Sequence, residues 1–390
     1  MHPTDPNPNM NLRRPMLSTC TRFTLAALLS FPVLAPNASA SATNGTPTAP
    51  QSKDDTVKLK TGEETGRIKG EEYGGLDFAP TKGQAHTIPW SDVVQITYQG
   101  GESFDSARDL INQGKLDDAL TALTDLLKPE AKLRGLIKQH VLFNIAALNN
   151  RLGKSDAALD GFKALLKEFP KSRYLPDVAE GIVSAYGAKS DLDGARKALD
   201  ELNAGATTAG VEANFSAILA VQRGRILERQ KKWSEAYSAY NAALTTSGVT
   251  AVASQQARLG QARCQVEQKK PTEAEGLYRK ISGEDAPNWI LAGAWNGLAD
   301  LAKAEGREKR DANVLLDALF MYLRGVVQYG PVPGEPSNEY ERALAGAAEC
   351  FDNLYQVESN KDLKARYARS RDERYAQLAK EFPNSPYNKK

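Results

Sequence analysis

A short pattern of one small and one large apolar residue recurs through most of this chain, and it limits the possible folds more than any other feature. An alanine is followed four residues later by a large apolar residue, as in Ala158 and Phe162. Successive copies lie 39, 37, 41, 38 and 44 residues apart, with their alanines at Ala119, Ala158, Ala195, Ala236, Ala274 and Ala318. Residues four apart share one face of an α-helix, and a small side chain lets two helices approach closely. The pattern therefore predicts a series of packed helical hairpins.

Glycine and proline positions indicate where these helices end. Gly114 and Gly153 each precede the alanine of their copy by five residues, where a turn with positive φ would join two helices. Pro170 ends the second helix of its copy, since proline cannot continue a helix. We expect a mainly α fold, a solenoid of about six to seven helical hairpins over 102–386. The pattern is least regular at 177–202 and 288–328, so the helix boundaries there are the least defined.

These residues resemble the repeat pattern of the tetratricopeptide repeat family. The clearest match covers 139–172, and later copies also fit the pattern; the matching residues are Ala146, Gly153, Ala158, Phe162, Pro170, Gly224, Ala236, Tyr240, Ala243, Ala262, Ala274 and Tyr278. The spacing of the copies exceeds the usual ~34 residues of this family, which predicts extra loop residues between hairpins. The resemblance implies an α-solenoid that binds a protein or peptide partner and has no catalytic role.

A longer segment occurs twice and narrows the resemblance. Phe169, Pro170, Ser172 and Tyr174 follow the second helix of one copy, and the same residue types recur from Phe382 to Tyr387. This segment is similar to one in tetratricopeptide proteins of the bacterial cell envelope, such as those of outer-membrane assembly and the Tol system. The resemblance implies an adaptor that works in the cell envelope.

The first residues of the chain predict export. Arg13, Arg14 and Arg22 precede an apolar run at 23–35, and small residues at 38–40 offer a cleavage site. The run is shorter than the ~20 residues that a membrane-spanning helix needs. We therefore expect a signal peptide at 1–40, a flexible linker at 41–53, and a periplasmic or secreted product without a membrane span.

Residues 54–98 have a different pattern, with short runs of alternating apolar residues separated by glycine and proline. Such runs predict a small antiparallel β-sheet or barrel. The expected core residues are Leu59, Ile68, Leu76, Phe78, Ile88, Val94 and Ile96. The segment loosely resembles the SH3-like or Sm-like small barrels found in exported bacterial proteins. His86 lies in a Gly/Lys-rich stretch and is expected in a solvated loop.

Charge and motifs exclude several classes of function. The chain has 50 Lys+Arg and 48 Asp+Glu, which argues against a nucleic-acid partner. HExxH, CxxC, GxSxG and P-loop motifs are absent from the sequence. We therefore expect no enzyme activity, no catalytic residue, no metal and no cofactor. Cys264 and Cys350 lie two hairpins apart, so no disulfide is expected between them, since each repeat of a solenoid touches only its neighbours.

Binding of a partner is the function that remains. By resemblance to the family, the first helices of the hairpins would line a groove, and the candidate partner-binding residues are His140, Phe143, Asn150, Arg151, Arg225, Glu228, Arg229, Gln256 and Arg263. Several arginines along one groove would suit an acidic or C-terminal carboxylate peptide, although the Lys/Asn arrangement of the family's carboxylate clamps is absent. Each of these residues could equally belong to an ordinary solvated helix face.

Two functions remain open from the sequence. The first is an exported, non-catalytic scaffold that binds a protein or peptide in the cell envelope. The second is an exported protein that binds glycan or cell-wall peptide, with the small β domain as its reader. A shelf of aromatic side chains at Tyr73, Trp90 and Tyr98 would favour the second function, whereas packing of these residues in the core would not.

Overall fold

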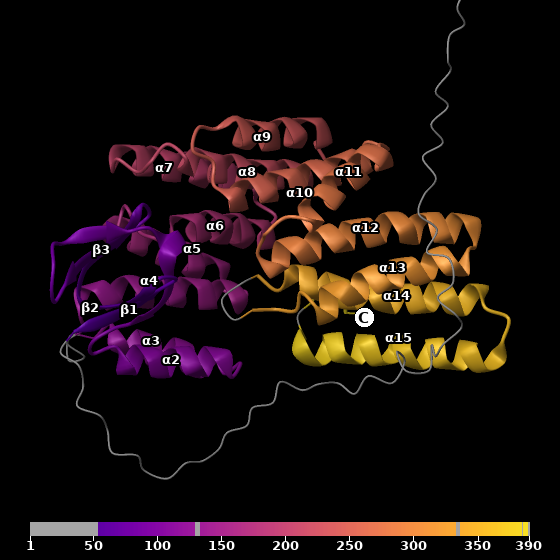
Figure 1. Ribbon diagram of the computed structural model, residues 1–390, viewed down its shortest axis with the longest axis horizontal. Coiled ribbons are helices and arrows are strands. Elements are labelled where there is room, and N and C mark those ends of the chain that lie inside the picture. The colour runs from indigo at the N-terminus through magenta and orange to yellow at the C-terminus, as the bar shows by residue number, and fades with distance from the viewer. Residues whose placement is uncertain (1–53, 129–132, 333–335, 384, 389–390) are drawn as a thin grey trace, which may run out of the picture. The chain divides into compact units, whose positions relative to one another are not determined.

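The computed structural model describes residues 54–128, 133–332, 336–383 and 385–388. All of them belong to one compact unit of the chain. The expected signal peptide at 1–40 and linker at 41–53 lie outside the described residues. From residue 54 onward, strands come first and helices follow (Figure 1).

The strands form one antiparallel sheet, as the alternating pattern predicts. They are β1 Asp55–Leu59, β2 Gly62–Glu72, β3 Gly75–Pro80, β4 His86–Ile88 and β5 Val93–Thr97, with a short 3-10 helix at Trp90–Asp92. Their order in the sheet is β4-β3-β2-β1-β5. Because β4 and β5 are the two edge strands, closure into a barrel is not seen among the described strands. His86 belongs to edge strand β4, and not to a loop as expected.

The sheet buries Val57, Ile68, Leu76, Phe78 and Ile88 on one face. Val94 was expected in this core, but 56% of it is exposed. The pairing of β1 with β5 explains the difference, since Lys58 is opposite Gln95 whereas Leu59 is opposite Val93. Val94 is the extra residue of a β-bulge, which turns its side chain away from the core.

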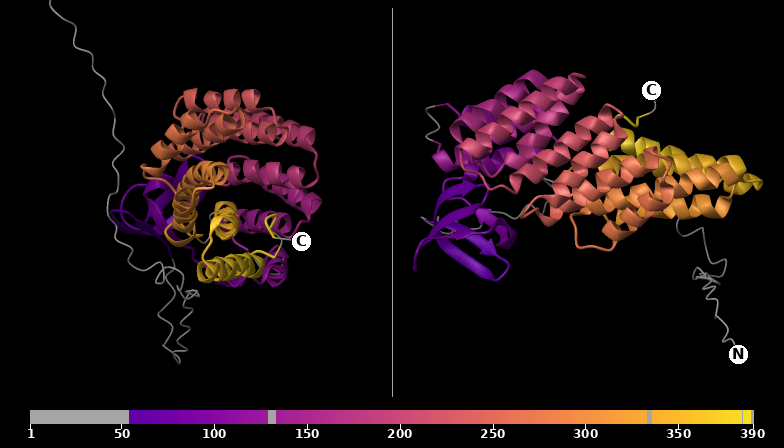
Figure 2. Two further views of the ribbon diagram at one scale, coloured as in Figure 1. Left: turned by 90° about the vertical axis from the view of Figure 1, so that its right-hand side faces the viewer. Right: turned by 90° about the horizontal axis from the view of Figure 1, so that it is seen from above.

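The rest of the described chain is helical. Its fourteen α-helices are α2 Glu102–Asn112, α3 Leu116–Leu126, α4 Gly135–Arg151, α5 Ser155–Glu168, α6 Leu175–Ala188, α7 Leu192–Thr208, α8 Phe215–Arg229, α9 Trp233–Thr245, α10 Ala251–Glu267, α11 Pro271–Ser282, α12 Asn288–Lys309, α13 Ala312–Val327, α14 Asn338–Val357 and α15 Lys361–Glu381. Helices that follow each other in the chain pack side by side, and the first helices of neighbouring hairpins also touch (Figures 1 and 2). In the described part of the chain, every helix is too short or too polar to cross a membrane.

A residue with positive φ joins the two helices of most hairpins. Gly114 and Gly153 have this conformation, as predicted, and so do Ser190, Lys231, Lys269 and Arg310. The first five of these six residues precede the alanine of their copy by five positions. Arg310 precedes Ala318 by eight, because α13 begins about one turn earlier relative to its alanine than the other second helices do. In that extra turn, Gly306 of α12 lets Leu315 approach. The extra turn accounts for the longest spacing between copies, 44 residues. The helix boundaries that the sequence left least defined at 288–328 are those of α12 and α13.

The turn residues with positive φ give a first testable prediction. Lys231 has φ of 58° and is exposed, and a lysine there is strained where glycine would not be. We expect Lys231→Gly to raise the free energy of unfolding by about 0.5–1 kcal/mol, and Gly153→Ala to lower it by about 1 kcal/mol. Urea unfolding of both variants measures these changes. A loss of stability in Lys231→Gly would contradict this assignment of the turn.

Aromatic side chains of the second helices fill the space beside glycines of the first helices. Phe162 packs on Gly181, Tyr278 on Gly297, and Tyr322 on Gly346. Tyr240 lies between two glycines, Gly224 of its own hairpin and Gly260 of the next. A side chain at any of these glycines would overlap the ring, so the aromatic residue and the glycine fix how closely successive helices approach.

The two similar segments after α5 and α15 form the same turn. The amide of Ser172 donates to the Phe169 carbonyl at 3.0 Å, and the amide of Ser385 donates to the Phe382 carbonyl at 3.0 Å. Each serine hydroxyl then accepts from the amide of its tyrosine, at 3.1 Å for Tyr174 and 3.3 Å for Tyr387. The repeated sequence therefore encodes a local structure, which in the first copy leads directly into α6.

Candidate partner-binding site

A buried polar cluster joins the sheet to the helices. Glu71 of β2 is at its centre: its Oε2 lies 2.9 Å from His140 Nε2 and 3.4 Å from Arg173 Nη1, and its Oε1 accepts from the Tyr98 hydroxyl at 2.7 Å. Burial alone would raise the pKa of Glu71, but the hydrogen bond and charge of His140 and the charge of Arg173 outweigh it and lower the pKa. Nearby, Arg134 forms a bidentate contact with the buried Asp55 at 2.6 and 2.7 Å.

Two of the candidate partner-binding residues, His140 and Phe143, lie in or beside this cluster. His140 is 2% exposed, and its Nδ1 lies 2.7 Å from the Tyr174 hydroxyl. Phe143 stacks on Tyr174 with ring centroids 3.9 Å apart. Both side chains therefore hold α4 against its neighbours, with His140 buried and Phe143 partly buried. Sequence periodicity places them on the predicted face of α4 but cannot show that the sheet and the turn before α6 cover it.

The three aromatic residues that could have formed a shelf are engaged in contacts with other residues; Tyr98 is buried, whereas Tyr73 and Trp90 are partly buried. The guanidinium of Arg173 lies 3.9 Å above the Trp90 ring, and Trp90 Nε1 donates to the Glu72 carbonyl at 2.8 Å. Tyr98 is buried, and Tyr73 meets Phe215 edge-on at 5.4 Å. These contacts remove the feature that would have favoured a glycan reader.

Two of the four candidate arginines, Arg225 and Arg263, are paired with acids of the neighbouring hairpin. Arg225 of α8 lies 3.0 Å from Glu180 of α6, and Arg263 of α10 lies 3.1 Å from Glu228 of α8. Further along, Arg342 of α14 pairs with Asp300 of α12. These ion pairs link successive first helices, and those of Arg225 and Arg263 neutralise charges that the sequence assigned to a partner.

Arg229 differs from these arginines. Its Nη1 donates to the Val183 carbonyl of α6 at 3.0 Å, and its guanidinium occupies the space that a side chain at Gly187 would fill. No ion pair of Arg229 is found in the described part of the chain. Burial and the positive charge of Arg225 lower the pKa of Arg229. The structure thus holds one guanidinium in place while several of its donors stay unused.

The remaining candidates do not join a common site with Arg229. Asn150 and Arg151 lie at the end of α4, and Gln256 lies on α10. Arg151 is exposed, whereas Asn150 and Gln256 are partly buried. Among the predicted residues, the structure therefore brings together Arg225 with Arg229 and Glu228 with Arg263.

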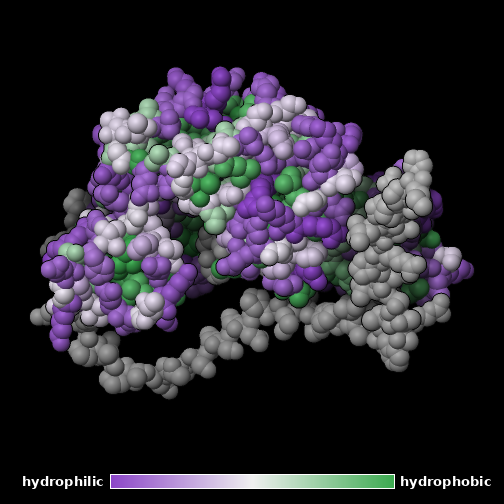
Figure 3. Space-filling model, turned by 45° about the horizontal axis from the view of Figure 1, so that its top comes forward, coloured by the Kyte–Doolittle hydropathy of each residue, from purple (hydrophilic) through white to green (hydrophobic). Residues whose placement is uncertain are grey.

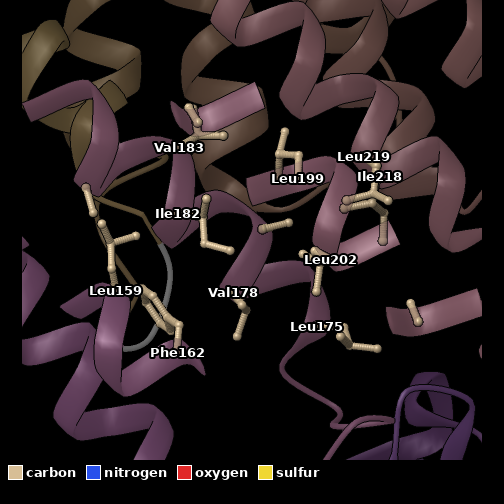
Figure 4. Packing of buried hydrophobic residues seen from close by; sticks show 14 of the residues in the cluster. Leu159, Phe162, Leu175, Val178, Ile182, Val183, Leu199, Leu202, Ile218 and Leu219 are labelled. Atoms are coloured by element: carbon tan, nitrogen blue, oxygen red, sulfur yellow. The ribbon is translucent and has the colours of Figure 1, made fainter. Parts of the chain in front are cut away.

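A cavity of about 300 Å³ lies elsewhere, among α5, α6 and α7, and the sequence did not predict it. Figure 4 shows Leu159 and Phe162 of α5, Ile182 of α6 and Leu202 of α7 around this region. Its α7 wall contains the small residues Ala198, Gly205 and Ala206. In the sequence, the small residues of α7 that line this cavity were the only indication of it. On the face seen in Figure 3, apolar surface forms small patches among hydrophilic residues.

Groups that could support metal or thiol chemistry do not gather within the described residues. No set of three or more His, Cys, Asp or Glu side chains is placed there to hold a metal ion. Cys264 and Cys350 are buried and unpaired, and burial raises the pKa of both thiols to about 12. Both therefore act as small apolar side chains in the core.

The described chain is thus a protein of packed helical hairpins preceded by a small antiparallel sheet. The sequence profile of the tetratricopeptide repeat matches residues 140–172, which cover most of α4, all of α5 and the turn that follows. This part of the chain matches the tetratricopeptide repeat, as the sequence pattern predicts.

Solved structures to which this chain is similar include a tetratricopeptide repeat protein from Parabacteroides merdae, with 18% identity, a TM-score of 0.38, and coverage of 70% of this chain and 98% of that one. PilW, a type IV pilus biogenesis factor, has 17% identity and a TM-score of 0.38, with coverage of 64% and 96%. PilF of Pseudomonas aeruginosa has 16% identity and a TM-score of 0.38, with coverage of 64% and 94%. No curated protein matches the chain. At such similarity, the function has to be argued from this chain's own residues.

Proposed function

We propose that this protein is an exported, non-catalytic scaffold that binds an acidic segment of a protein partner in the cell envelope. The observation that carries the proposal is Arg229, a guanidinium anchored on α6 without a carboxylate partner among the described residues. Arg225 lies one turn away on the same helix, where it pairs with the partly exposed Glu180.

A carboxylate is the group that this arrangement suits best. Guanidinium groups bind carboxylates through two parallel hydrogen bonds, and such charged hydrogen bonds are stronger than neutral ones. The Val183 carbonyl orients Arg229, so little side-chain freedom is lost when an anion binds. Binding would also relieve the repulsion between Arg225 and Arg229. An acidic side chain or a C-terminal carboxylate of a peptide supplies this group.

Export and location in the envelope are supported by the arginines, apolar run and small residues of 1–40 and by the repeated segment at 169–174 and 382–387. Binding of glycan or cell-wall peptide by the β domain, which resembles SH3-like domains, is the second candidate. The first is favoured, because Tyr73, Trp90 and Tyr98 are engaged in contacts with other residues.

The test uses a fluorescent decapeptide of glutamates and its amidated form, titrated into the protein and followed by anisotropy. Replacing Arg229 by Glu should weaken peptide binding about tenfold or more, since a hydrogen bond to a charged group contributes ~1.5–3 kcal/mol. Lys269→Glu, which makes the same charge change at an exposed turn, is the matched control. Equal affinities of the two variants would contradict the proposal. Capture from envelope extract with the original protein and with Arg229→Glu would then identify the partner.

A further inference from the structure

The cavity among α5, α6 and α7 is a second candidate site, separate from α8 and its arginines. Its walls are the second helices α5 and α7, and its floor is the first helix α6. The floor and walls are mostly apolar, and include Leu159, Phe162, Ile182, Tyr186 and Leu202. No residue of α8 lines this cavity.

On the α7 side, the cavity is lined by small residues. Gly205 lies inside α7, and a side chain there would meet no atom within 4 Å. Glycine destabilises the interior of a helix relative to alanine, and here no close approach of another element requires it. Ala198 and Ala206 leave further space beside it. The cost of this glycine to the helix is therefore not offset by packing against another element.

Charged residues are unevenly distributed around the rim of the cavity. Lys163 and Lys167 lie one turn apart on α5, both exposed, and neither has an ion-pair partner in the described residues. Other lysines of this part of the molecule are paired, such as Lys138 with Glu168 and Lys189 with Asp156. Glu201 on α7 is the acidic residue of the opposite wall. The α5 side therefore offers two free cations next to an apolar cavity.

We propose that this cavity binds an amphipathic helical segment of a partner protein, with apolar side chains in the cavity and carboxylates beside Lys163 and Lys167. A helix of this kind binds a groove through apolar residues spaced by three or four positions. About 300 Å³ lies at the lower end of ligand cavities (~300–1,000 Å³). This size suits one or two large apolar side chains. The two lysines select a segment with acidic residues next to them.

The test uses three labelled 14-residue helical peptides and, separately, decanoate. The first peptide has leucines three and four residues apart with glutamates beside them, the second has lysines in place of the glutamates, and the third has alanines in place of the leucines. We expect the first to bind at least tenfold more tightly than the other two, as measured by anisotropy. If the lysine peptide bound with the same affinity as the first peptide, the proposal would be overturned. It would also be overturned if the protein bound decanoate but not the first peptide.

Two variants of the protein localise the binding. Gly205→Leu fills the cavity with a large side chain, and leucine favours helix more than glycine does. The variant should therefore bind the first peptide at least tenfold more weakly, without a lower melting temperature. Gly276→Leu is its matched control, because a side chain there also meets no atom within 4 Å, on α11. Replacing both Lys163 and Lys167 by Glu should weaken binding about tenfold. Unchanged affinity in Gly205→Leu would show that the peptide binds elsewhere.

This proposal goes beyond the acidic-peptide site of α8, and the two can fail independently. Gly205→Leu is expected to leave the affinity for the glutamate decapeptide unchanged. In Arg229→Glu, the first peptide should keep an affinity at least tenfold higher than that of the alanine peptide, which has the same glutamates. Loss of that preference in Arg229→Glu would assign the peptide to α8 and overturn the proposal for the cavity.

Discussion

Replacing Gly260 by alanine should lower the free energy of unfolding by about 2–3 kcal/mol. The added methyl group would overlap the ring of Tyr240, which is fully buried. The ring cannot move away, because Gly224 is packed against it as well. Overpacking of this kind typically costs ~1–3 kcal/mol, and a ring confined between two helices is at the upper end of that range. Urea unfolding followed by circular dichroism measures the change.

Two further variants make this prediction specific. Gly276→Ala, in an exposed part of α11, should raise the free energy of unfolding by about 0.5–1 kcal/mol, since alanine favours helix and meets no other atom. Combining Gly260→Ala with Tyr240→Leu should recover part of the stability relative to the sum of the two single variants, because the smaller side chain leaves room for the methyl group. Additive losses would mean that the ring and Gly260 do not limit each other.

Replacing Glu71 by glutamine should lower the free energy of unfolding by about 3 kcal/mol. The carboxylate of Glu71 is buried and contacts His140, Arg173 and Tyr98. Removing one partner of a buried charged cluster typically costs ~3–5 kcal/mol, because the other charged groups stay buried without a partner. The neighbouring Glu72 is exposed and lies 3.7 Å from Lys171, so Glu72→Gln should cost only ~0–1 kcal/mol. Similar losses in both variants would contradict the role of Glu71.

The same cluster predicts how stability depends on pH. The pKa values of Glu71 and Asp55 are lower in the folded protein than their ordinary values of 4.5 and 3.8. For Asp55, burial opposes the shift, and hydrogen bonds from Arg134 and from the amides of Ile68 and Gln99 outweigh it. A lowered carboxyl pKa contributes stability above the ordinary value, and this contribution is lost as the pH falls through the lowered value.

We therefore expect the free energy of unfolding to fall steadily as the pH drops below about 4.5. Glu71→Gln should be less stable at pH 7 and show a shallower decline in acid, since one of the titrating groups is gone. Unfolding measured between pH 7 and pH 3 compares the two slopes. An identical slope in the variant would show that Glu71 does not contribute to the acid dependence.

The helical part of the fold could be predicted because its signals are local. A small residue and a large one four positions later define one face of a helix, wherever the helix lies. Gly114 and Gly153 indicate their own turns, because positive φ is costly for other residues. This rule missed Ser190, Lys231, Lys269 and Arg310, which have the same conformation without a glycine. The turns at Ser190, Lys231 and Lys269 could be placed only from the spacing to the next alanine, and Arg310 departs from that spacing.

The candidate site was harder to predict, because it depends on residues that are distant in the chain. Arg225 and Arg263 were assigned to a partner, but Glu180 and Glu228 on neighbouring first helices already pair with them. Arg229 lies on the same helix as Arg225 and has the same side chain. Its availability follows from Gly187 and the Val183 carbonyl on another helix, which orient it without neutralising it.

The sequence by itself determined the helical repeat, the turn glycines and the strands of the small sheet, since each depends on the spacing of neighbouring residues along one element. The tertiary structure alone decided that His140 is buried against Glu71, that Val94 faces solvent at a bulge, and that α5, α6 and α7 leave a cavity between them. These features depend on how side chains from separate elements meet. Periodicity identifies the face that a residue occupies, but the neighbouring elements determine whether that face is covered, paired or open.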